Sequence, residues 1–250
     1  MIAKIDLITA EECKVLVDKV LTLKEHWISR NNYYGEDVGV SLAYPDFHTL
    51  GAAAYLDGPS AHVNNNNELI LRHFSDIINM VADVISKELG APTFLDPDYA
   101  CPGFHIFRGR DTMLYGTRFG GSIHLDAPHI TSEFSFDFDK SRPITFTLAL
   151  SMPKNGGGMN YWLEDDHLKD IKRGKTTDQI SMLYEYLSPQ FRNWVDVNKI
   201  YEEYKIGTLY IHDGQTLHQV ANEVPTFSDD IRVTLQGHGV YRKEGLMLYL

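Results

Sequence analysis

The sequence predicts one α+β domain in which helices pack outside a β-sandwich or barrel. Two helical patterns occupy the first 100 residues, and short segments rich in β-branched and aromatic residues follow after residue 102. Segments of the two kinds that are separated along the chain in this way are typical of the α+β class. No repeat, low-complexity tract or linker divides the 250 residues, and a β-rich chain of this length often forms a single domain.

The first helix is expected to begin near Thr9. The stretch "TAEE" has the pattern of a capping box, with Thr9 as the N-cap and Glu12 at the third helical position. Apolar residues then recur at helical spacing as far as Trp27.

Residues 31–67 are rich in Gly, Tyr and Asn and show no clear period. The segment is longer than an ordinary connection in a compact domain. Two interpretations remain open: a peripheral excursion that covers the core, and a lid over a substrate. Its last part, the run of asparagines at 64–67, is expected to be a loop with Asn67 as the N-cap of the next helix.

The second helix is expected over residues 68–89, with a broad apolar face and a stop signal at Gly90 and Pro92. A mainly helical interruption is expected at 176–204. The predicted strands lie in the segments "FHIFRG", "SIHLDA", "ITFTLALSM", "GMNYWLE", "GTLYIHDG", "LHQVA" and "IRVTLQGHGVY".

Composition excludes some partners and a membrane-spanning role. The net charge of −11 argues against nucleic acid or an anionic membrane surface, because both require basic patches. No window approaches 18 consecutive apolar residues, and the N-terminus lacks the pattern of a signal peptide. Cys13 and Cys101 are too few for a disulfide framework, so reduced thiols are expected. These features predict a cytoplasmic protein, and they are compatible with a homodimer.

The segment "IHLDAPHI" carries the first candidate for chemistry. In a strand, His124 and Asp126 would project from the same face, into one space. A carboxylate buried there is costly unless a positive charge such as a divalent cation compensates it. The His-x-Asp pattern is common by chance, so further ligands are needed to support a metal site.

Candidate partners follow downstream. His218 opens a short strand after a tight turn, and His212, at the end of the preceding strand, is the alternative third ligand, although a surface hydrogen-bonding role is expected for it. Arg232 and Thr234 are again two apart on one strand face, a pair suited to a terminal carboxylate. Two imidazoles and one carboxylate leave three positions open on an octahedral ion, the arrangement of non-haem Fe(II) oxygenases.

This order of residues resembles the Fe(II)- and 2-oxoglutarate-dependent dioxygenases. The matching residues are His124, Asp126, His218, Arg232 and Thr234, and "MPKNGGGMNYW" is similar to the family's glycine-rich hairpin. Arg232 lies a few residues further from His218 than in many members. The resemblance covers roughly residues 100–240. It implies a double-stranded β-helix (a jelly-roll, cupin-like barrel) over 101–250, braced by N-terminal helices within 1–100.

The resemblance also implies the activity and the cofactors. His124, Asp126 and His218 would bind Fe(II), while Arg232 and Thr234, with His105 nearby, would bind 2-oxoglutarate, the co-substrate consumed with O2. Because Asp126 is present, hydroxylation is favoured over the halogenation that some members perform. The expected substrate is a small molecule such as a free amino acid, as in the small bacterial branch of hydroxylases and halogenases. Two alternatives stay open: a non-catalytic cupin-like metal- or ligand-binding protein, and a peptidyl or protein hydroxylase.

Several other residues have two interpretations. His105 and Thr147 are equally compatible with contact to the 2-oxo acid and with ordinary barrel packing. Tyr161 and Trp162 are candidates for a substrate pocket, although aromatic residues in barrels are more often core. His129 is expected to turn away from the metal because it follows Pro128.

Overall fold

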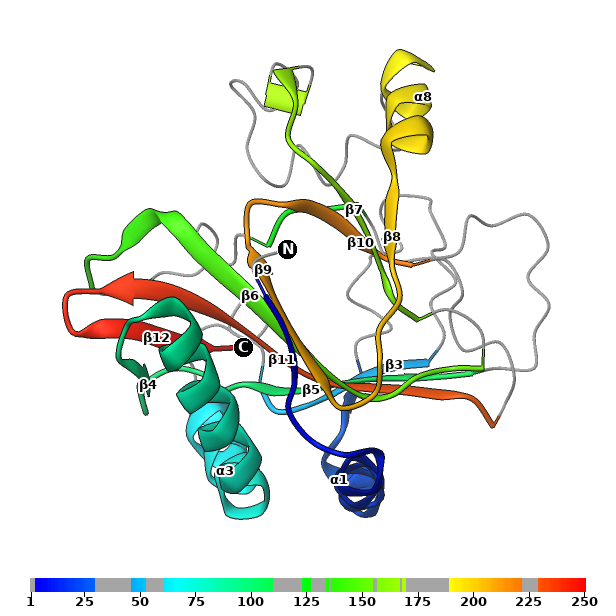
Figure 1. Cartoon of the computed structure of the whole chain (residues 1–250). Coiled ribbons are helices and arrows are strands. Elements are labelled where there is room, and N and C mark those ends of the chain that lie inside the picture. The colour runs from blue at the N-terminus through cyan, green and yellow to red at the C-terminus, as the bar shows by residue number, and fades with distance from the viewer. Residues whose placement is uncertain are drawn as a thin grey trace.

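The computed structural model consists mainly of two β-sheets, a large one of nine strands and a small one of three (Figure 1). It describes residues 3–29, 46–52, 61–109, 123–126, 134, 136–154, 157–166, 168–169, 189–221 and 229–250. The elements are β1 (Ala3–Asp6), α1 (Ala10–Thr22), the 3-10 turn η1 (Lys24–His26), β2 (Ile28–Ser29), β3 (Asp46–Leu50), α3 (Ala61–Leu89), β4 (Thr93–Leu95), β5 (Gly103–Arg108), β6 (Asp139–Ser151), β7 (Met159–Trp162), α8 (Pro189–Asn198), β8 (Ile200–Glu202), β9 (Thr208–Asp213), β10 (Leu217–Val220), β11 (Ile231–Arg242) and β12 (Gly245–Tyr249).

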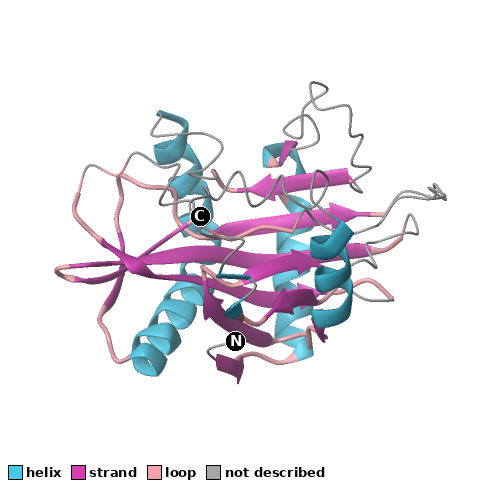
Figure 2. Cartoon of the chain, turned by 90° about the horizontal axis from the view of Figure 1, so that it is seen from above, coloured by secondary structure: helices cyan, strands magenta, loops and turns pink. Residues whose placement is uncertain are grey.

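The large sheet is the framework of the molecule. Its strand order is β1-β9-β6-β11-β5-β3-β2, with β12 beside β11 and β4 beside β12. The small sheet has the order β10-β7-β8. Helices α1 and α3 lie on one side of the large sheet and the small sheet lies on the other, as the two views show (Figures 1 and 2). The predicted α+β class is therefore confirmed.

Alternation along the strands of the large sheet separates a core face from a polar face. In β6, Ile144, Phe146, Leu148 and Leu150 join the main hydrophobic core with the apolar faces of α1 and α3. Thr145 and Thr147, the residues between them, point to the opposite face and are also buried. Both faces of β6 are covered. Polar residues on the face opposite the core, such as Thr145 and Thr147, therefore point into the interior of the protein.

Helix α1 begins as predicted and ends earlier. Thr9 is the N-cap, and the reciprocal bonds with Glu12 form the capping box. The helix ends at Thr22 rather than continuing to Trp27, because η1 follows it. The Trp27 ring folds back instead, and its Nε1 donates to the Val20 carbonyl at 3.1 Å.

Helix α3 corrects the expectation for the asparagine run. It spans Ala61–Leu89 instead of 68–89, so Asn67 lies inside the helix and is not an N-cap. The Asn67 side chain is buried; it donates to the Tyr99 carbonyl at 2.7 Å and accepts from the Cys101 N–H at 2.8 Å. These bonds tie the helix to the segment that leads into β5. Tertiary partners here outweigh the tendency of Asn to leave a helix.

Several other expectations about helices, strands and loops are tested only in part by the described residues. Strand β3 lies within the segment 31–67, for which no period was predicted, and it pairs with β5. Residues 31–45 and 53–60 fall outside the described residues, and so does His129. Strands β1 and β12 were not predicted. In the interruption expected at 176–204, α8 is helical and β8 is a strand.

Cys13 and Cys101 are free and buried, as expected of reduced thiols. Within the described part of the chain, no helix combines the length and the apolar character needed to span a membrane.

Candidate metal centre

Two histidines that are distant along the chain meet at a β-bridge. The N–H of His124 donates to the carbonyl of His218, and the N–H of His218 donates to the carbonyl of His124, both at 2.9 Å. The imidazole centroids lie 4.4 Å apart. His218 belongs to β10 as predicted, but His124 and Asp126 are not in a regular strand, because their segment makes only this isolated bridge. The bridge nonetheless brings the predicted residues together.

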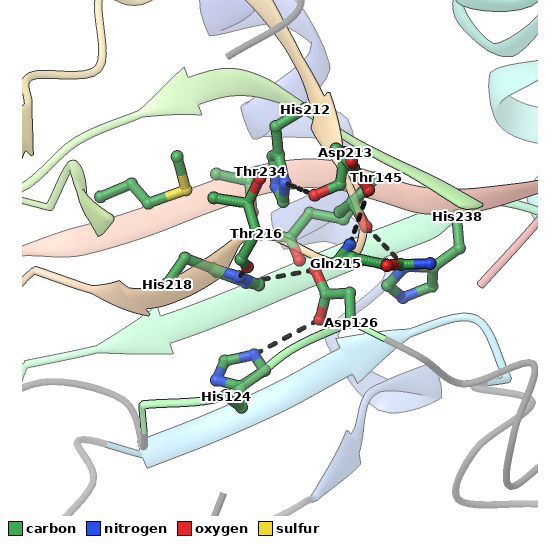
Figure 3. A network of polar contacts seen from close by, with 12 residues as sticks. His124, Asp126, Thr145, His212, Asp213, Gln215, Thr216, His218, Thr234 and His238 are labelled. Atoms are coloured by element: carbon green, nitrogen blue, oxygen red, sulfur yellow. Dashed lines mark hydrogen bonds and ion pairs between the residues drawn. The ribbon is translucent and has the colours of Figure 1, made fainter. Parts of the chain in front are cut away.

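Asp126 completes a compact cluster with the two imidazoles (Figure 3). Its Oδ1 lies 3.4 Å from His124 Nε2, and its Oδ2 lies 3.2 Å from His218 Nε2. One ligand atom from each of the three residues lies within 4.8 Å of the other two. Burial opposes ionisation of Asp126, but the charge and hydrogen bonds of the histidines outweigh it and hold the pKa of the carboxyl well below its usual range.

The turn before β10 orients the His218 ring. Thr216 N donates to the Asp213 carbonyl at 2.9 Å, which closes the turn between β9 and β10. His218 Nδ1 lies 2.9 Å from the carbonyl oxygen of Thr216. Because a carbonyl only accepts, Nδ1 carries a proton, and Nε2, which faces Asp126, is the nitrogen that would bind a metal. A carbonyl partner of this kind is a common second contact of metal-binding histidines.

His212 is close to the cluster without belonging to it. Its ring centroid lies 4.9 Å from that of His218, but His212 is not among the residues whose ligand atoms converge. The expected surface role is wrong, since only 2 % of His212 is exposed. Burial and the neighbouring His218 lower the pKa of His212 to about 3, so its ring is neutral. Its Nδ1 lies 3.1 Å from the Asp213 carbonyl.

Arg232 is a buried cation whose hydrogen-bonding capacity is not fully used. Its Nε donates to the Gly157 carbonyl at 2.9 Å, while its Nη1 is buried and has no hydrogen-bond partner among the described residues. The guanidinium lies 5.4 Å from the centroid of Phe107 and 5.9 Å from that of Tyr204. Burial lowers the pKa of Arg232 to about 10, against the influence of Tyr204. A buried guanidinium in this state can accept an anion as a partner.

Thr234 and His105 lie on the same interior face. Thr234 is fully buried, and its Oγ1 accepts from Gln236 Nε2 at 3.0 Å. His105 on β5 is directly opposite Thr234 in the register. Tyr204, beside Arg232, is also influenced by the charge of Asp126. Tyr204 packs against Met159 on β7, so Arg232 lies between the two sheets. The His-Asp-His cluster lies between them as well, because His218 on β10 is beside His212 on β9.

Of the two interpretations of Trp162, the structure supports the core role. Trp162 is a core residue, 1 % exposed, and its Nε1 donates to the Val195 carbonyl at 2.8 Å. Tyr161 is paired with His218 across β7 and β10.

Two polar residues of this face were missed in the sequence. Gln236 and His238 continue the two-residue spacing of Arg232 and Thr234 along β11. Thr145 Oγ1 and His238 Nδ1 are 3.1 Å apart, and His238 contributes to the low pKa of Asp126. Extending the alternation through "RVTLQGH" would have identified both residues.

Comparison with known proteins gives matches among solved structures only. No protein-family model matches the sequence, and no curated protein matches it significantly. An N-substituted L-amino acid dioxygenase from Burkholderia ambifaria, in complex with alpha-ketoglutarate (2-oxoglutarate), is 11 % identical with a TM-score of 0.52; the match covers 99 % of this chain and 85 % of that one.

Two weaker matches have TM-scores below 0.5. The alpha-ketoglutarate-dependent epimerase SnoN from nogalamycin biosynthesis is 12 % identical (TM-score 0.46), over 95 % of this chain and 80 % of that one. A Pseudomonas putida prolyl-4-hydroxylase is 14 % identical (TM-score 0.41), over 96 % and 92 %. The similarity to the Burkholderia enzyme spans nearly the whole of this chain, which therefore shares the fold of that enzyme.

Proposed function

We propose that this protein is an Fe(II)- and 2-oxoglutarate-dependent oxygenase that hydroxylates an unactivated C–H bond of a small molecule. The observation that carries the proposal is the convergence of His124, Asp126 and His218, whose ligand atoms lie within 4.8 Å of one another. Two imidazoles and one carboxylate on one side of an ion form the facial triad of non-haem iron oxygenases.

The donor set fits a ferrous ion. Asp126 is ionised and largely buried, and its ion-pair partners among the described residues are the two histidines of the cluster. A divalent cation bound by the three side chains would supply the positive charge that this buried carboxylate needs. When bound, iron supplies the activation of O2 that side chains cannot perform.

The second half of the site fits 2-oxoglutarate. The unpartnered Nη1 of Arg232 would bind the distal carboxylate, while Thr234 adds a hydroxyl donor from the same strand face. Phe107 and Tyr204 flank the guanidinium and keep water from it, which strengthens a charge-assisted hydrogen bond. In this assignment the protein positions the 2-oxo acid between the anion site and the triad.

We infer that the two sheets form the double-stranded β-helix of this superfamily. The order β9-β6-β11-β5 in the large sheet faces β8-β7-β10 and the His124 bridge in the small one. We also infer one domain over residues 1–250, since the main core joins residues from α1, α3 and the large sheet.

The substrate is proposed to be a small molecule, with a free or N-substituted amino acid as the first class to test. The support is the fold similarity to the Burkholderia enzyme, whose own substrate is an N-substituted L-amino acid.

Two measurements test the proposal. Anaerobic addition of Fe(II) and 2-oxoglutarate should give a visible charge-transfer band, and aerobic incubation should convert 2-oxoglutarate to succinate. Both signals should be lost in Asp126→Ala. The control Asp166→Ala removes a fully exposed carboxylate and should retain both. A band or turnover that persists in Asp126→Ala would refute the assignment, and a band without turnover would favour a non-catalytic binding protein.

A further inference from the structure

Tyr249 on β12 carries a buried hydroxyl that, like Arg232 Nη1, has no hydrogen-bond partner among the described residues. It lies beside His238, toward the opposite end of β11 from Arg232. The Oη of Tyr249 is buried and makes no hydrogen bond among the described residues, and the whole side chain is 0 % exposed. A buried hydroxyl without a partner is destabilising, so its presence calls for an explanation. Arg232 Nη1 is the comparable atom at the opposite end, and the proposed co-substrate accounts for it.

The register places Tyr249 on the same face as the site. Tyr249 on β12 is directly opposite His238 on β11, and the ring centroids lie 5.6 Å apart. His238 is in turn opposite Thr145 on β6, and Thr145 is opposite His212 on β9. The four residues therefore form one row across the large sheet, and His212 at its far end lies beside His218.

His212 connects this row to the candidate metal centre, since its ring centroid lies 4.9 Å from that of His218. Burial, and then the negative charge of Asp126, raise the pKa of Tyr249, so the phenol keeps its proton. Tyr249 thus presents a neutral O–H group that can donate a hydrogen bond within electrostatic reach of the triad.

The co-substrate assigned to Arg232 lies toward the other end of β11 from Tyr249. Arg232 and His238 are six residues apart on β11, and six residues of strand span about 20 Å. This is longer than an extended five-carbon diacid.

We propose that Tyr249 is a substrate-binding residue that donates a hydrogen bond to an oxygen atom of the small-molecule substrate. This inference rests on the proposed function and names a property of its substrate: an acceptor oxygen, as in a carboxylate, carbonyl or hydroxyl group. The apolar part of the substrate would lie against the aromatic cluster around Tyr249, which includes Phe134 with its ring centroid at 5.2 Å. His238, bonded to Thr145, braces the Tyr249 ring from the neighbouring strand.

The test compares Tyr249→Phe with Tyr241→Phe. Tyr241 lies on the same pair of strands but packs against the main core on the opposite face, where Arg142 covers its ring. Without ligands, Tyr249→Phe should unfold at the same temperature as the wild type or higher, because no hydrogen bond is lost. A melting temperature lowered further than that of Tyr241→Phe would show an internal partner and overturn the proposal.

The second arm measures ligand binding by thermal shift, anaerobically, with Fe(II) and 2-oxoglutarate present. The probes are the common free L-amino acids, their N-methyl and N-acetyl derivatives, and the corresponding amines without oxygen. The probe that stabilises the wild type most should carry oxygen. Tyr249→Phe should need at least a tenfold higher concentration of it for the same shift, while Tyr241→Phe should need no more than the wild type.

Equal binding by Tyr249→Phe, a best probe without oxygen, or no stabilising probe would each overturn the role of Tyr249. The charge-transfer band separates this failure from failure of the proposed function. A wild-type protein without the band contradicts the oxygenase assignment itself. A Tyr249→Phe protein that alone loses the band shows that Tyr249 acts on the metal or the co-substrate, which also overturns the role in substrate binding.

Discussion

Replacing Arg232 with methionine should have opposite effects on ligand binding and on the stability of the ligand-free protein. Methionine has a similar length and fills the space between Phe107 and Tyr204 without charge. The substitution removes the hydrogen bond from Nε to the Gly157 carbonyl, which costs about 1–3 kcal/mol. It also removes a buried cation that has an unpartnered nitrogen, and this gain is about 1–4 kcal/mol for similar replacements.

The two contributions nearly cancel in the ligand-free protein. The free energy of unfolding of Arg232→Met should therefore lie within about 2 kcal/mol of the wild-type value. Binding of 2-oxoglutarate should suffer much more. Two charge-assisted hydrogen bonds to its carboxylate contribute about 3–6 kcal/mol, so affinity should fall at least about 100-fold.

Chemical denaturation with and without 2-oxoglutarate measures both effects in one assay. At a concentration 100 times the wild-type dissociation constant, the ligand should stabilise the wild type by about 2.7 kcal/mol and the variant by about 0.4 kcal/mol or less. Arg142→Met is the control, since Arg142 is an exposed partner of Asp139. A variant that still binds 2-oxoglutarate within threefold of the wild type would refute the anion site. A loss of several kcal/mol without ligand would show that Arg232 is mainly structural.

Two further predictions concern groups away from the site. Asn67→Ala should lower the free energy of unfolding by about 2–4 kcal/mol, because the Tyr99 carbonyl and the Cys101 N–H lose their partner. The control Asn198→Ala, at an exposed position, should change it by about 0.5 kcal/mol or less. Equal effects of the two substitutions in thermal denaturation would contradict the role of Asn67. Burial raises the pKa of Cys13 to about 11 and that of Cys101 to about 12 from the ordinary 9.0, so at pH 8 both thiols should react with iodoacetamide only after unfolding. The contribution of the two thiols to stability should be constant below about pH 9 and fall above it, because the thiols of the unfolded chain lose their protons first. Rapid alkylation of either native thiol would disprove this.

The local features were predictable because neighbouring residues determine them. Thr9 and Glu12 form a capping box through bonds within one helical turn, and the spacing alone identifies it. The alternation in "ITFTLAL" and "RVTLQGH" likewise predicts which residues share a face of β6 and β11. It placed Arg232 and Thr234 together on the interior face, where both are buried.

The errors arose where distant segments decide the outcome. Asn67 looked like an N-cap, but its bonds to Tyr99 and Cys101 hold it inside α3. His212 looked like a surface residue because a turn follows it, yet the packing of the two sheets buries it. Residues 123–126 looked like a strand, although only one bridge forms there. In each case a contact made after the chain has folded outweighs a local propensity.

By itself, the sequence determined the α+β class, the start of the first helix and the identity of the five residues proposed to bind the metal and the co-substrate. Their approach could not follow from spacing, because the separation of His124 and His218 along the chain says nothing about their separation in space. The tertiary structure decided it through the paired backbone bonds at the bridge, which set the two imidazoles beside Asp126. It also revealed that Tyr249 is buried without a partner, since burial depends on what the rest of the chain packs around a residue.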